Sequence, residues 1–89
     1  MLLEEKLRHQ AHLSPGEKNV ADHILSLGKD LKRYSTRNLA DLSYTSPPTV
    51  IRLCKKMGYS GFDQLKDQYL RELEYLEQDF GQVDVNFLF

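Results

Sequence analysis

A row of hydroxyl-bearing and basic side chains lies in the middle of this 89-residue sequence. Its members are Ser46, Thr49, Arg52, Lys55 and Lys56. Side chains of these types donate hydrogen bonds to phosphate oxygens, and a guanidinium can also pair bidentately with the edge of a guanine. If the segment is helical, the two hydroxyls stand at its positive end, where they and free backbone amides can hold a phosphate. The pattern predicts a surface that binds double-stranded DNA.

The cations of this surface have different expected roles. Arg52 is placed to read a base edge. Lys55, Lys56 and Arg37 add an attraction to the phosphate backbone that does not depend on base sequence. Pro48 belongs to the same exposed stripe. A helix that lies in a major groove requires an apolar face toward its own domain and hydrogen-bond donors on the opposite face, and this segment has both.

Other reactive residues form no recognisable site. Cys54 falls on the apolar side of the same segment, where a small core residue is expected. The three histidines have no metal-ligand spacing with any cysteine. Neither a nucleophile-base pair nor a glycine-rich phosphate loop is visible. We therefore expect no enzymatic activity, no metal and no cofactor.

Helix signals predict the elements that position this surface. A short leading helix is expected over about residues 2–11. The next helix begins with a capping box, in which Ser14 is the cap, Pro15 follows it and Glu17 lies three residues later, and it ends near Gly28.

Two further helices frame the basic row. One is expected from Thr36 to about Ser43, burying Leu39, Ala40 and Leu42. The other is expected from Ser46 to Met57, where Gly58 can take the left-handed conformation that ends a helix. Its buried face is predicted from the spacing i, i+3, i+4 and i+7, and consists of Val50, Leu53, Cys54 and Met57.

The connection between these two helices is only two or three residues long, and it contains Tyr44 and Thr45. Two short amphipathic helices joined so tightly form a helix-turn-helix. A fifth helix is expected from Gly61–Phe62 to Gln78 or Asp79, with Gly81 ending it. The sequence thus predicts an all-α fold, a compact bundle of about five short helices over residues 1–80, with residues 81–89 starting a linker.

Charge is unevenly distributed along the chain. Its net charge is −1, but residues 29–60 hold seven basic and two acidic residues, whereas residues 61–89 hold two basic and seven acidic ones. A footprint for a phosphate backbone depends on this local excess rather than on the total. A single cysteine favours a reducing cytoplasm, and no apolar run predicts a membrane segment.

Several stretches resemble the N-terminal domain of the RpiR family, bacterial regulators of sugar metabolism. They are Leu13 to Pro15, Glu17–Lys18, Val20 to Asp22, Leu39–Ala40 and, most specifically, Thr49 to Phe62. The resemblance spans about Leu13 to Leu70. The sequence departs from it at the turn, where Tyr44 and Thr45 replace a glycine and an aliphatic residue, and at Pro47–Pro48, which replace a small polar or acidic pair.

The resemblance implies a homeodomain-like helix-turn-helix that binds DNA as a dimer. It also implies a C-terminal sugar isomerase-type domain that senses phosphosugars and that this chain is too short to contain. By position, the helix after Ser46 becomes the recognition helix, with Ser46, Thr49, Arg52 and Lys55 facing DNA.

Two functions remain in view. The first is a sequence-specific DNA-binding domain of a bacterial transcriptional regulator of sugar or amino-sugar metabolism. The alternative is a helical protein-interaction module whose basic stripe only solubilises it. A near-heptad seam in the fifth helix is consistent with a homodimer, in which its first half covers the core and its second half meets a copy. The alternative is that the whole seam packs within its own domain. The seam consists of Phe62, Leu65, Tyr69, Leu73, Leu76 and Phe80.

Overall fold

The computed structural model describes residues 2–88, with side chains described for residues 2–77. Every regular element in this range is helical, which confirms the predicted fold class. In chain order the elements are α1 (Leu3–Arg8), α2 (Pro15–Leu27), the 3-10 helix η1 (Gly28–Arg33), α3 (Thr36–Leu42), α4 (Pro47–Lys56) and α5 (Phe62–Leu88).

The start and end of α2 follow from its own sequence. The Ser14 hydroxyl accepts the Glu17 amide at 3.2 Å, and the Glu17 carboxylate accepts the Ser14 amide at 2.9 Å. Gly28 ends the helix with a φ of 55°. The predicted capping box is confirmed. The sequence did not indicate η1, which follows directly and buries only Leu31.

The core lies where α2, α3, α4 and the first half of α5 meet. Leu3 and Leu7 of α1 are buried against it, and Phe62, Leu65 and Tyr69 of α5 close it. The predicted burial of Leu42 is wrong, since 37% of this residue is exposed. The inner face of α3 is formed by Leu39, Ala40 and the buried Ser43, and at about 100° per residue Leu42 is rotated away from the centre of that face.

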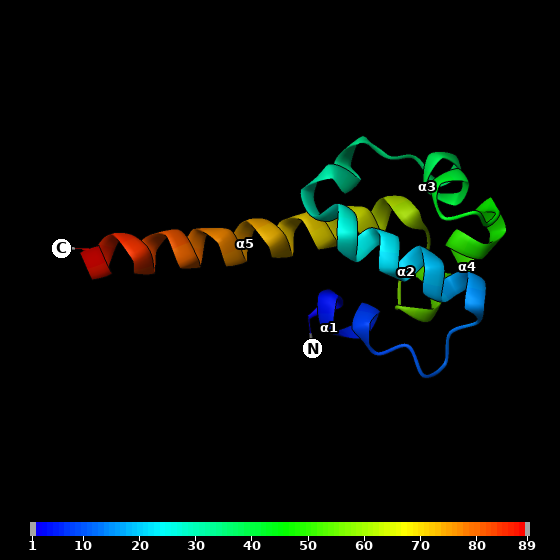
Figure 1. Cartoon of the computed structure of the whole chain (residues 1–89), viewed down its shortest axis with the longest axis horizontal. Coiled ribbons are helices and arrows are strands. Elements are labelled where there is room, and N and C mark those ends of the chain that lie inside the picture. The colour runs from blue at the N-terminus through cyan, green and yellow to red at the C-terminus, as the bar shows by residue number, and fades with distance from the viewer. Residues whose placement is uncertain (1, 89) are drawn as a thin grey trace.

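α5 is longer than predicted. It runs through Gly81 to Leu88 instead of ending near residue 79. A glycine inside a helix costs only about 1 kcal/mol relative to alanine, and no proline follows it to stop the helix. Figure 1 shows that α5 crosses the body and projects beyond it, while α3 and α4 lie at the opposite end of the molecule. The domain boundary at residue 80 stays a prediction.

Polar contacts fix the body to α5. Both carboxylate oxygens of Glu72 accept the Leu3 amide, at 2.9 and 3.0 Å, so that α1 is held on α5. The Lys66 ammonium donates to the Tyr34 carbonyl at 2.8 Å, and Lys29 pairs with Glu77. Of the predicted seam, Leu73 packs partly against the core, and the Phe80 side chain lies outside the described residues.

Candidate nucleic-acid interface

The turn between α3 and α4 is held by a small hydrogen-bond network. The buried hydroxyl of Ser43 donates to the Leu39 carbonyl at 2.7 Å and lies 2.9 Å from the Thr45 hydroxyl. The amide of Thr45 donates to the Ala40 carbonyl at 2.9 Å. The Leu39 carbonyl also accepts the Ser43 amide at 3.0 Å, and the Thr45 amide uses the Ala40 carbonyl, which the end of α3 would otherwise leave without a partner. They fix the path of the chain into α4.

Tyr44 is the one residue of this turn with unusual backbone geometry. Its φ is 56°, in the left-handed region, which is costly for a side chain with a Cβ atom. The residue is 93% exposed, so packing does not compensate for the strain. A glycine at this position would adopt this conformation freely.

The predicted buried face of α4 is confirmed. Val50, Leu53 and Cys54 are fully buried and Met57 nearly so. Burial raises the pKa of the Cys54 thiol to about 12, which keeps it protonated and unreactive at neutral pH. The opposite side of α4 exposes Pro48, Arg52, Lys55 and Lys56 to solvent. The helix therefore presents its cations outward from a fixed apolar back.

A chain of hydrogen bonds joins three of the predicted site residues. The hydroxyl of Ser46 lies 3.0 Å from that of Thr49, which in turn accepts a hydrogen bond from the Arg52 guanidinium at 3.2 Å. Thr49 is buried, whereas 62% of the Arg52 side chain is exposed. Thr49 thus orients Arg52 from the buried side of α4, and the guanidinium of Arg52 carries the exposed hydrogen-bond donors.

Backbone amides at the start of α4 differ from the expectation. Pro47 and Pro48 have no N–H, and the amides of Thr49 and Val50 both donate to the Ser46 carbonyl, at 2.9 and 3.2 Å. The prediction that free backbone amides of this turn hold a phosphate is therefore wrong for residues 47–50. Residues 47–50 therefore offer no backbone N–H to a phosphate, and the hydroxyl of Ser46 is a side-chain donor at this end of α4.

Lys56 has a different setting from Lys55. Its ammonium donates to the Glu17 carboxylate at 2.6 Å and to the His12 carbonyl at 3.0 Å. Lys55 is exposed on α4, as is Arg37 on α3. The structure thus brings Ser46, Thr49 and Arg52 together, leaves Lys55 and Arg37 as separate exposed cations, and ties Lys56 to α2.

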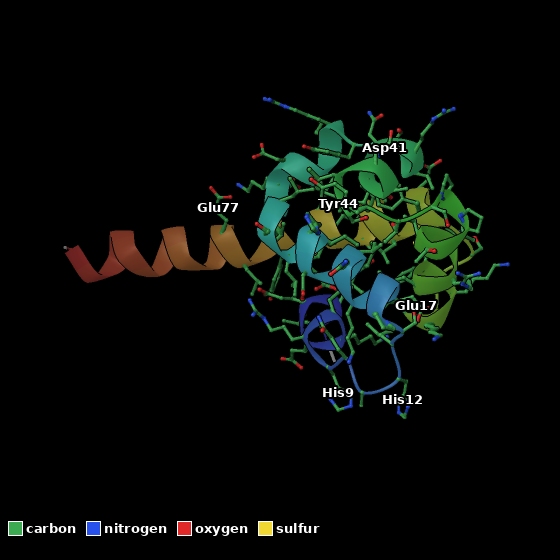
Figure 2. The ribbon with its side chains drawn as sticks, turned by 45° about the vertical axis from the view of Figure 1, so that its right-hand side comes forward. His9, His12, Glu17, Asp41, Tyr44 and Glu77 are labelled. Atoms are coloured by element: carbon green, nitrogen blue, oxygen red, sulfur yellow. The ribbon has the colours of Figure 1, made fainter. Side chains whose placement is uncertain are left out.

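Glu17 is the residue of this region that sequence reasoning missed. The sequence assigned it only to the capping box, yet just 2% of it is exposed, and it lies where the start of α2 meets α4 (Figure 2). Its carboxylate also lies 3.8 Å from the Arg52 side chain. Its partners on α4 are 35 and 39 positions away in the chain, so no local pattern could reveal them.

Other kinds of site gain no support. His9 and His12 point outward from the segment between α1 and α2 (Figure 2). Among residues 2–77, no three histidine, cysteine or acidic side chains are grouped so that they could hold a metal ion. No helix in the part of the chain that the structure describes is long and apolar enough to cross a membrane.

Comparison with known proteins identifies relatives of this architecture. Residues 1–75 match the family described as "Helix-turn-helix domain, rpiR family". The chain is similar to the HTH-type transcriptional regulator HexR of Pseudomonas aeruginosa, with 36% identity over 72 residues, which cover 81% of this chain and 25% of that protein. It is also similar to the uncharacterized HTH-type transcriptional regulator YbbH of Bacillus subtilis, with 34% identity over 62 residues, covering 70% of this chain and 21% of that protein. No solved structure matches it at a significant level.

Proposed function

Because the chain belongs to the rpiR family of helix-turn-helix domains, we propose that α4 is the recognition helix of a sequence-specific bacterial transcription regulator. In this arrangement α4 enters the major groove with its exposed face toward the bases. Arg52 reads a base edge, and Lys55 and Arg37 attract the phosphate backbone. Ser46 and Pro48 border the groove-facing end of the helix. The domain has no catalysis of its own.

The observation that carries this proposal is the chain of hydrogen bonds that joins the side chains of Ser46, Thr49 and Arg52. An arginine that reads a base must be held in one direction, since a free side chain would lose much of the binding energy in ordering itself. The hydroxyl of Thr49, itself buried, supplies that support at 3.2 Å. A merely solubilising arginine would not require a buried partner on its own helix.

The wider biological role extends the proposal. The chain spans about a quarter and a fifth of the length of the two relatives. We propose that it acts in the cytoplasm within a homodimer, that a further C-terminal domain responds to a phosphosugar, and that the genes controlled serve sugar or amino-sugar metabolism. Two recognition helices in a dimer would read a palindromic site.

The first experiment measures binding of the 89-residue chain to a labelled random duplex of about 20 base pairs while salt rises from about 50 to about 200 mM. We expect weak binding whose affinity falls as the salt concentration rises. A preferred site is then selected from a library of random duplexes. A chain that binds neither random nor selected DNA would instead be a protein-interaction module.

Variants then test the assigned roles. Arg52→Ala should cost about 1–3 kcal/mol on the selected site and relax discrimination at one position. Lys55→Ala should weaken binding to all sequences alike. Arg71→Ala, which removes an exposed cation from α5, is the matched control and should change neither. Equal effects of Arg52→Ala on selected and random DNA would refute the base-reading role.

A further inference from the structure

We propose that Glu17 is a specificity-determining positioning residue of this DNA-binding surface: it holds the charge of Lys56 away from DNA phosphates and steadies Arg52. This inference rests on the proposed function. Its consequence is a surface that attracts DNA of arbitrary sequence less strongly than its cations would allow. Discrimination between the correct site and random DNA depends on the second part of this role, because a steadied Arg52 favours one base over the others.

The geometry shows two cations of one helix converging on one carboxylate. Arg52 and Lys56 are four residues apart and therefore lie on the same side of α4. The Lys56 ammonium is 2.6 Å from one oxygen of Glu17, and the Arg52 Nε atom is 3.8 Å from the other. The contact with Lys56 is direct, whereas Arg52 lies at the outer limit of an ion pair with Glu17 and donates one terminal nitrogen to Thr49.

Glu17 is buried far beyond what capping α2 requires. Its side chain is 3% exposed, whereas the side chains of Lys56 and Arg52 are 43% and 62% exposed. A buried carboxylate is costly unless hydrogen bonds and an opposite charge compensate it. Burial alone would raise the pKa of Glu17, but the bonds from Lys56 and Ser14 outweigh it and leave the pKa below its ordinary value. Glu17 is thus ionised at neutral pH and opposes the charge of Lys56.

This arrangement has a measurable effect on salt dependence. Each cation that contacts a phosphate adds about 0.9 to the slope of log affinity against log salt. Lys56 is committed to Glu17 and to the His12 carbonyl, so it should not contribute to that slope. Once released, the exposed ammonium can reach a phosphate and bind DNA regardless of sequence.

The test compares Glu17→Gln with the parent on random duplex DNA and on the selected site. Glutamine keeps an oxygen that can accept the Ser14 amide, so the cap of α2 is retained while the charge is lost. Because Lys56 is released, we expect tighter binding to both DNAs and a salt slope steeper by about 0.9. Because Arg52 is no longer steadied, we also expect a lower ratio of selected to random affinity. Adding Lys56→Met to Glu17→Gln should return the slope to that of the parent.

Two results would overturn the inference. One is a Glu17→Gln variant that loses stability and weakens binding to both DNAs with an unchanged slope, because Glu17 would then serve the fold alone. The other, which does not depend on Glu17→Gln folding, is a single Lys56→Met variant whose slope falls as much as that of Lys55→Met. Failure of the proposed function is distinct, since the parent itself would then show no salt-dependent DNA binding.

Discussion

Tyr44→Gly should stabilise this domain although it removes a large side chain. Tyr44 has a φ of 56°, and the left-handed conformation costs a non-glycine residue about 1–2 kcal/mol. Because Tyr44 is 93% exposed, removing its ring sacrifices little packing. Glycine loses more backbone freedom on folding, which returns about 0.5–1 kcal/mol of the gain. We expect a net stabilisation of about 0.5–1 kcal/mol.

Thermal and urea unfolding measure this effect. For a domain of this size the expected gain raises the melting temperature by about 2–8 °C. In urea the midpoint should rise while the slope m is unchanged, since the surface exposed on unfolding is nearly the same. Tyr44→Ala is the matched control, because it removes the ring and keeps the Cβ atom. If glycine is no more stable than alanine here, the strain at Tyr44 does not govern the stability of the turn.

The remaining predictions concern the core, the buried charge and self-association. Leu53→Ala should destabilise the domain by about 2–5 kcal/mol in urea unfolding, since Leu53 is fully buried; a loss comparable with that of an exposed site would contradict this placement. Cys54 should react with a thiol reagent only as fast as the domain opens, and a rate that denaturant does not change would argue against its burial. The fold lowers the pKa of Glu17 below 4.5, so its ionised form stabilises the domain above that pH and the contribution is lost as the pH falls through the lowered pKa. Between neutral pH and about pH 3 the parent should therefore lose more stability than Glu17→Gln, and parallel losses would oppose this reasoning. In sedimentation equilibrium the chain should form a dimer that Leu76→Glu weakens; a parent that stays monomeric at high micromolar concentration would place dimerisation outside these residues.

Local signals predicted most of the scaffold correctly. The cap at Ser14, the end of α2 at Gly28 and the buried face containing Val50 and Leu53 all depend on residues within a few positions of one another. Such patterns act through intrahelical bonds and helical periodicity, which the sequence displays directly.

Errors arose where distant segments decide the outcome. Leu42 and Leu39 are alike in sequence, and only the packing of α3 makes one exposed and the other buried. Gly81 permits a helix end without requiring one. Ser46 and Arg52 were identified from residue type, but the role of Glu17 depends on where α2 crosses α4. A pairing between charges 39 residues apart follows from tertiary structure and cannot be read from spacing.

The length of α5 has a mechanical consequence. Its 27 residues extend about 40 Å at 1.5 Å per residue, in a molecule whose longest dimension is 49 Å. In a continuous helix, each inserted residue rotates everything beyond it by about 100° and moves it along the axis by about 1.5 Å. Any surface on the far half of α5 therefore has a fixed rotational phase relative to α4. If two copies pair through that half, their contact sets the spacing of the two recognition helices and so the distance between the DNA half-sites that they read. This contact lies at the end of the molecule opposite α4.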